Sequence, residues 1–108
     1  MNSWIDVRGA SEQLYRYQMA ENARPRSAVS GTFIYVRQEK KGHSIIYAGQ
    51  TLNLAEGSPA FWQLAVKEHG ATHLYTRLNV AAAAREAELA DLLAVETPPM
   101  NKALQESH

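Results

Sequence analysis

Residues 31–49 read GTFIYVRQEKKGHSIIYAG and form the clearest pattern in the chain. A run of β-branched and aromatic residues is followed by a charged turn that contains a glycine, and then by a second apolar run. Two such runs around a short polar turn predict a β-hairpin. Because side chains alternate along a strand, Phe33 and Tyr35 are expected on one face of this hairpin and Ile34 on the other.

Another hairpin is predicted nearer the N-terminus, within residues 1–20. Residues 4–8 alternate apolar and polar side chains, residues 9–11 are small turn formers, and residues 14–19 are rich in aromatic residues. Residues 20–30 are polar, contain a proline between two arginines and have no period, so they are predicted to form a connecting loop.

The rest of the chain predicts two helices and one more strand. Ser58 as N-cap and Pro59 in the first helical position predict a helix that runs to about His69 and ends at Gly70. Residues 72–78 have the composition of a third strong strand.

The stretch 81–95, AAAAREAELADLLAV, consists almost entirely of good helix formers and predicts the longest helix. Asn79 is expected to cap its start, and the prolines at 98 and 99 to stop it. Residues 100–108 are predicted to form a short, polar, frayed tail. This order of elements predicts one α+β domain over residues 1–108, with an antiparallel or mixed sheet flanked by helices.

Composition and charge narrow the classes of function. The 108 residues carry 11 Lys plus Arg and 11 Asp plus Glu, so the formal net charge is zero. A broad electrostatic attraction to nucleic acid is not expected, and any binding of DNA or RNA is predicted to be weak and to use a local patch. The chain has no cysteine, which excludes disulfides, thiolate zinc sites and cysteine nucleophiles. No apolar run approaches the roughly 20 residues of a membrane helix, so we expect a cytoplasmic protein without a membrane partner.

Several short motifs in residues 31–102 resemble those of the GIY-YIG nuclease family. In chain order they are Gly31-Thr32-Phe33, Tyr47-Ala48-Gly49, Asn53-Leu54 and Pro98-Pro99-Met100-Asn101. Their order and their placement on a hairpin, a loop and a helix end match the family pattern. The resemblance implies a GIY-YIG-like core over these residues, to which the hairpin within residues 1–20 is added.

The same comparison implies a degenerate active site. The family's first tyrosine aligns with Phe33, its phosphate-orienting arginine with Gly57, and its metal-holding glutamate with Leu89. None of these three side chains can bind a cation or transfer a proton. The leading hypothesis is therefore a non-catalytic GIY-YIG-like domain, without a cofactor, that binds nucleic acid or a protein partner, including a second copy of itself.

The alternative hypothesis is a metal-dependent endonuclease, a phosphodiesterase with a rearranged site. In that case Tyr47, with Tyr35, would help to deprotonate the attacking water, and Glu86 would hold Mg²⁺ or Mn²⁺ against the phosphate. Glu86 lies about one helical turn before Leu89. The competing interpretation is that Glu86 and Glu88 are solvated carboxylates at the borders of an apolar helix face.

The basic residues supply the candidates for nucleic-acid contact. Lys40 and Lys41 lie in the turn of the second hairpin, and Arg24 and Arg26 lie in the preceding loop. Solvated loops have the same composition, so this alternative stays open. Asn101 is a further candidate, although asparagine also bonds readily to nearby backbone. In a third hypothesis the exposed hairpin edge pairs with another chain, and the domain serves in assembly.

Overall fold

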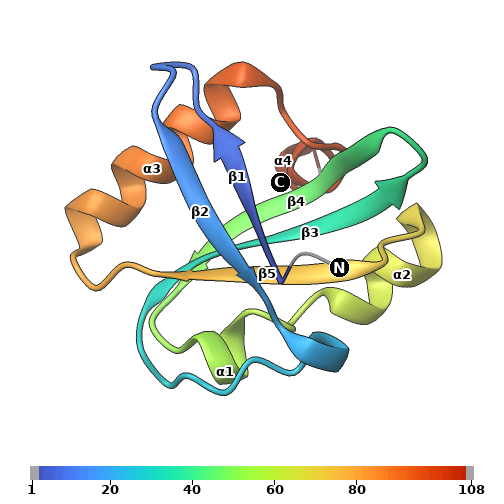
Figure 1. Ribbon diagram of the computed structural model, residues 1–108, viewed down its shortest axis with the longest axis horizontal. Coiled ribbons are helices and arrows are strands. Elements are labelled where there is room, and N and C mark those ends of the chain that lie inside the picture. The colour runs from blue at the N-terminus through green and yellow to red at the C-terminus, as the bar shows by residue number, and fades with distance from the viewer. Residues whose placement is uncertain (1–2, 107–108) are drawn as a thin grey trace.

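The computed structural model describes residues 3–106, which form an α+β fold around one five-stranded antiparallel sheet in the order β1-β2-β5-β3-β4. The strands are β1 (Trp4–Arg8), β2 (Leu14–Met19), β3 (Gly31–Glu39), β4 (Gly42–Thr51) and β5 (His73–Leu78). Figure 1 shows the β1–β2 hairpin passing in front of the other three strands, so that the sheet curls. The predicted fold class and the predicted N-terminal hairpin are confirmed.

Short helices surround the sheet. They are the 3-10 helix η1 (Glu21–Ala23) and the α-helices α1 (Leu54–Gly57), α2 (Trp62–His69), α3 (Ala82–Val95) and α4 (Pro99–Glu106). The helix η1 lies in the stretch that the sequence predicts to be a loop. Across residues 3–106, no helix is long and apolar enough to cross a membrane.

The β3–β4 hairpin has the predicted pairing. Tyr35 lies opposite Tyr47, and the register shifts by one residue between Tyr35 and Val36 because of a β-bulge. Strand β5 pairs with the other side of β3, with Tyr75 opposite Ile34. Strand β3 is therefore central among these three strands, and its residues 31–36 are all buried.

Alternation along β3 divides the core into two clusters on opposite faces of the sheet. The first cluster contains Phe33 and Tyr35, with Leu54 of α1 and Met100 of α4. The second cluster lies inside the curl of the sheet. Its buried members are Val7, Tyr15, Tyr17, Ile34, Val36, Ala48, Tyr75 and Leu92. Helix α3 packs on this second face through Leu92, with Leu89 and Leu93 partly buried beside it.

The predicted start of the 58–69 helix is wrong. Helix α2 begins at Trp62, and Ser58 instead ends α1, where its hydroxyl donates a 2.6 Å hydrogen bond to the carbonyl of Leu54. The Ser-Pro motif therefore separates two helices and does not start one. The predicted end is correct, because Gly70 adopts φ 68° and its N–H bonds back to carbonyls of α2.

Two predictions at the ends of α3 are also wrong. The N-cap is Ala81, and the side chain of Asn79 bonds elsewhere. Residues 99–106 form helix α4, whereas the sequence predicts a frayed tail. Pro99 occupies the first helical position, which tolerates proline, and Met100 is only 2% exposed, so its burial anchors the helix. The last two residues of the predicted tail lie outside the described part of the chain.

We predict that Leu92→Ala lowers the free energy of unfolding by about 2 to 5 kcal/mol, because it leaves a cavity between α3 and the sheet. The matched control is Leu52→Ala, since Leu52 is 77% exposed and its truncation should cost no more than about 0.5 kcal/mol. Urea denaturation of both variants measures the difference. Equal costs would show that α3 does not pack through Leu92.

Candidate functional site

An aromatic cluster on β3 and β4 occupies the place that the resemblance assigns to the active site. The ring centroids of Phe33, Tyr35 and Tyr47 lie 5.4 to 5.8 Å apart. Phe61 contacts the Tyr47 ring edge-on at 5.9 Å, and Trp62 contacts the Tyr35 ring edge-on at 5.3 Å. The structure therefore brings both predicted tyrosines together, next to the start of α2.

The two tyrosine hydroxyls differ in their surroundings. The Tyr35 hydroxyl donates to the carbonyl of Ser58 at 2.5 Å and accepts from the N–H of Phe61 at 3.1 Å. Burial raises the pKa of Tyr35 to about 12. Among the side chains that the structure describes, which end at residue 104, the Tyr47 hydroxyl has no hydrogen-bond partner, and burial raises its pKa as well. Neither hydroxyl is thus prepared to take a proton from water near neutral pH.

The position of the family arginine is closed to any side chain. A Cβ atom added to Gly57 would lie 1.9 Å from the Thr51 hydroxyl oxygen and 2.8 Å from the Thr51 Cβ. An arginine at this position would require the α1 backbone or Thr51 to move. Gly57 is therefore required by the close contact between α1 and the end of β4.

The structure does not bring Glu86 to Tyr47. Glu86 is exposed on α3, and α3 packs on the sheet face opposite to the aromatic cluster. Leu89, at the position of the family glutamate, packs in the second cluster on that same opposite face. Among the described side chains, which end at residue 104, no group of three or more His, Asp or Glu residues is arranged to hold a metal ion.

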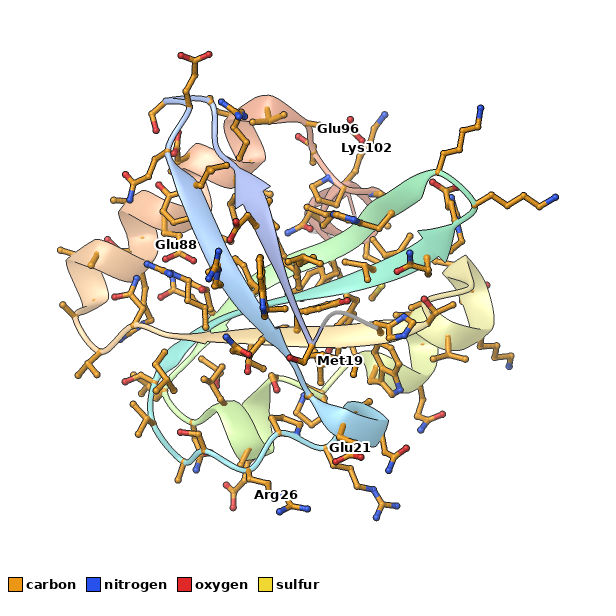
Figure 2. The ribbon with its side chains drawn as sticks, viewed as in Figure 1. Met19, Glu21, Arg26, Glu88, Glu96 and Lys102 are labelled. Atoms are coloured by element: carbon orange, nitrogen blue, oxygen red, sulfur yellow. The ribbon has the colours of Figure 1, made fainter. Side chains whose placement is uncertain are left out.

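Glu88, in contrast, is buried at 3% exposure, and the prediction of a solvated carboxylate is wrong for this residue. Its Oε2 atom accepts hydrogen bonds from the hydroxyls of Tyr17 and Thr32, both at 2.5 Å. Its Oε1 atom accepts from Arg77 Nε at 2.9 Å and from the Asn79 side-chain amide at 3.1 Å. Figure 2 shows Glu88 on the side of the molecule where α3 faces the sheet. Four donors from β2, β3, β5 and the following loop thus converge on one carboxylate.

A second buried charge lies one turn away on α3. Arg85 is 5% exposed, and its guanidinium donates to the side chain of Gln50 and to the carbonyls of Asn79 and Val80. It joins the start of α3 to the end of β4. Arg77 and Arg85 thus both bind specific acceptors.

Sequence reasoning missed this polar network. The available signals were Thr32 within an apolar strand and Glu88 at the helical spacing of Leu92. A polar residue on the buried face of a strand and a carboxylate on the buried face of a helix require each other as partners. Their pairing depends on how α3 crosses the sheet, which periodicity does not specify.

The four basic candidates do not form one patch. The Lys40–Lys41 turn lies at the upper right in Figure 1, whereas Arg26 lies at the lower edge in Figure 2, drawn from the same side. All four side chains are exposed, and none has a hydrogen bond or ion pair within the described residues. Arg24 and Arg26 remain close together, on the loop between η1 and β3.

Asn101 has a structural role in this fold. Its side-chain oxygen accepts from the N–H of Ala48 at 2.9 Å, and its side-chain amide donates to the carbonyl of Ala48 at 2.8 Å. The residue thereby satisfies both backbone groups of one position on the edge strand β4. These two hydrogen bonds hold α4 against the sheet. They use both the oxygen and the nitrogen of the Asn101 side-chain amide.

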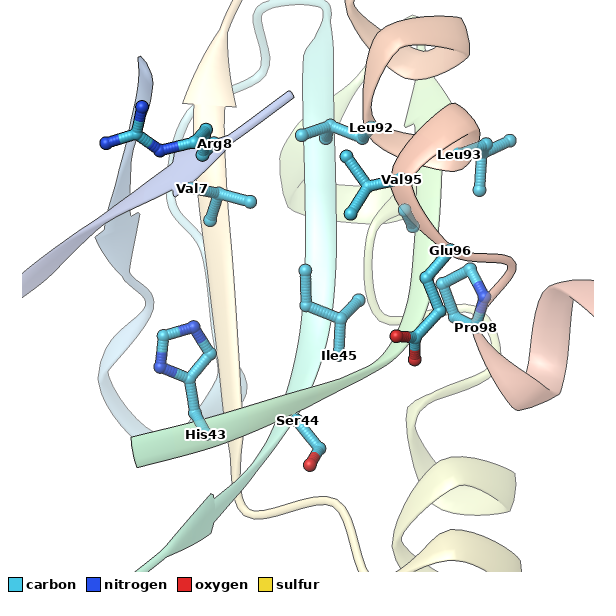
Figure 3. A pocket seen from close by; sticks show the side chains of 11 residues that line it. Val7, Arg8, His43, Ser44, Ile45, Leu92, Leu93, Val95, Glu96 and Pro98 are labelled. Atoms are coloured by element: carbon cyan, nitrogen blue, oxygen red, sulfur yellow. The ribbon is translucent and has the colours of Figure 1, made fainter. Parts of the chain in front are cut away.

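The cavity in Figure 3 lies between β1, β4 and the end of α3 and has a volume of about 250 Å³. Val7, Ile45, Leu92 and Val95 point into it, and the Glu96 carboxylate lies toward Ser44 at its edge. None of the residues proposed from the sequence lines this cavity. It is on the α3 face and therefore separate from the aromatic cluster.

Comparison with known proteins finds no family model, no curated protein and no solved structure that matches this chain.

We predict that Glu88→Ala lowers the free energy of unfolding by about 3 kcal/mol, because it removes the acceptor shared by Tyr17, Thr32 and Arg77 and leaves the Tyr17 hydroxyl with only Thr32 as a partner. Glu86→Ala is the matched control on the same helix and should change stability by no more than about 0.5 kcal/mol. Thermal and urea unfolding of both variants test this. A larger loss for Glu86→Ala would contradict the assignment.

Proposed function

We propose that this chain is a GIY-YIG-like domain that lacks nuclease activity, takes no metal cofactor and binds nucleic acid. The observation that supports the absence of nuclease activity is the set of side chains around Tyr47. Its ring contacts are with Phe33, Tyr35 and Phe61, and within the described part of the chain its hydroxyl has no hydrogen bond with a charged side chain. Phosphodiester cleavage requires charged groups or a metal ion to stabilise the charge that develops on the phosphate.

The carboxylates of α3 support the same proposal. Glu88 is engaged by four donors on the other face of the sheet, and Glu86 projects from an exposed position. Neither is placed to hold Mg²⁺ or Mn²⁺ beside Tyr47. The endonuclease alternative would require α3 to move to the opposite face of the sheet.

Unpaired cations support binding to nucleic acid. Arg16, Arg37 and Arg77 form ion pairs with Asp6, Glu39 and Glu88. Arg24 and Arg26 have no such partner within the described residues and lie together on one loop, where they are free to contact phosphates. Contacts of this kind position a ligand without reading its sequence, so the proposed binding is weak and largely independent of sequence.

The positions of the basic residues determine how steeply the proposed binding should depend on salt concentration. If all four candidate cations contacted duplex DNA together, the slope of log K against log salt would be about −3 to −4. Because the Lys40–Lys41 turn and the Arg24–Arg26 loop lie at different ends of the molecule, a short duplex can use only one pair. We therefore expect a slope of about −2.

A protein partner is the second candidate, and one observation favours it. Four exposed apolar side chains gather at the end of the sheet where β3 begins: Val29, Leu52, Leu78 and Val80, with exposed fractions of 41 to 77%. Gly31 pairs with both Thr51 and Leu78, which places these segments side by side. Clusters of exposed apolar residues are typical of protein interfaces.

We predict that the purified chain binds a six-base-pair duplex weakly, with a salt slope of about −2, and that it does not cleave DNA or RNA with Mg²⁺ or Mn²⁺. Fluorescence anisotropy at two salt concentrations measures binding, and gel analysis measures cleavage. Arg24→Gln/Arg26→Gln should abolish the salt dependence, whereas Lys40→Gln/Lys41→Gln should leave it unchanged.

Two outcomes would contradict the proposal. Metal-dependent cleavage that Tyr47→Phe removes, with the melting temperature unchanged, would establish a nuclease. No binding of duplex or single strand at low salt would exclude the nucleic-acid function and favour a protein partner at the apolar cluster.

A further inference from the structure

A cavity of about 360 Å³ lies between η1, α1 and α2, close to the aromatic cluster. Its lining differs from that of the cavity under α3. The lining includes one indole ring, two prolines, two side-chain amides and one guanidinium, supplied by Trp62, Pro25, Pro59, Asn22, Gln63 and Arg24. Its volume lies at the lower end of the range of small-molecule sites.

Trp62 is held in one orientation at this cavity. It packs against the first core cluster, and the Tyr35 ring meets it edge-on at 5.3 Å. Tyr35 is itself fixed by its two backbone hydrogen bonds to Ser58 and Phe61. The indole N–H has no acceptor among the groups that the structure describes, whose side chains end at residue 104. Trp62 is therefore a rigid aromatic surface with a free donor, and a ligand that stacks on it does not have to order it first.

The backbone beside Trp62 is strained. Asn22 and Ala23 both lie in the left-handed region, with φ 55° and 56°, although neither is a glycine. Such conformations cost energy in L-residues, and they are found preferentially at functional sites. Ala23 packs against the first core cluster here, and the next residue, Arg24, lines the cavity with its side chain unpaired within the described chain.

We propose that this cavity binds one nucleotide unit of single-stranded nucleic acid, with the base stacked on Trp62 and the phosphate bound by Arg24. The amides of Asn22 and Gln63 are the groups available to the edge of the base. The proposal rests on the nucleic-acid function proposed above and specifies where and in which form the ligand binds. Stacking on an aromatic side chain requires an unpaired base, because bases in a duplex are covered by their neighbours.

Charged side chains around the cavity indicate the path that the nucleic-acid strand takes beyond it. Glu21 lines the adjacent cavity on the other side of η1 and is labelled beside it in Figure 2. Its carboxylate repels phosphate there. The strand therefore continues past Arg24 toward Arg26, and Glu21→Gln should strengthen binding.

The test titrates the full chain carrying Trp4→Phe, in which Trp62 is the only tryptophan, with the oligonucleotide dT10. We expect dT10 to quench the Trp62 fluorescence and to bind more tightly than a duplex of the same length. Arg24→Gln should weaken binding severalfold and reduce the salt slope by about 0.7. Trp62→Leu should weaken binding about tenfold, measured by anisotropy of labelled dT10, while the melting temperature shows whether the variant is folded.

The matched control is Lys102→Gln, which removes one cation at the opposite edge of the molecule (Figure 2) and should leave dT10 binding unchanged. Duplex binding without quenching by dT10 would overturn the stacking site but leave the proposed function intact. Equal losses for Arg24→Gln and Lys102→Gln would also overturn the site, because binding would then follow overall charge. No binding of either nucleic acid would overturn both proposals.

Discussion

This fold depends on the hydrogen bonds that the buried carboxylate of Glu88 accepts. The carboxylate is buried between α3 and the curled sheet and accepts from Tyr17 of β2, Thr32 of β3 and Arg77 of β5. A buried carboxylate is costly unless donors surround it, so these strands and α3 must take one relative arrangement for the charge to be satisfied. The β2–β5 pairing comprises only two residue pairs, and the network joins the N-terminal hairpin to the rest of the sheet at this junction.

This arrangement separates the Glu88 network from Tyr35 and Tyr47. Thr32 and Phe33 are neighbours on β3 and point to opposite faces, so the polar network and the aromatic cluster lie on different sides of one sheet. In our proposal the chain retains a GIY-YIG-like frame but uses its buried carboxylate to hold the fold. In the same proposal the ligand binds on the aromatic face, where the ring contacts of Tyr47 are with Phe33, Tyr35 and Phe61.

Local patterns predicted most of the fold, and long-range contacts account for the errors. The two hairpins, β5, the Gly70 helix end and the apolar stripe of α3 follow from alternation, turn chemistry and helical period. The predicted start of α2 is wrong because the Ser58 hydroxyl bonds to the carbonyl of Leu54 and ends α1. Helix α4 is not predicted because the burial of Met100 anchors it. At the candidate site, the hairpin pattern predicts that the strands carrying Tyr35 and Tyr47 pair. It does not predict the β-bulge between Tyr35 and Val36 that places the two tyrosines opposite each other. The environment of Glu88 was not predictable, because four segments distant in sequence create it.

The most direct test of this account is a double-mutant cycle between Tyr17→Phe and Glu88→Ala, measured by urea denaturation. Both hydroxyl and carboxylate are buried and joined by a 2.5 Å hydrogen bond. The account predicts a coupling free energy of about 1 to 3 kcal/mol between the two positions. Costs that add to within about 0.5 kcal/mol would show that the hydroxyl and the carboxylate act independently, and would contradict the central role of the Glu88 network.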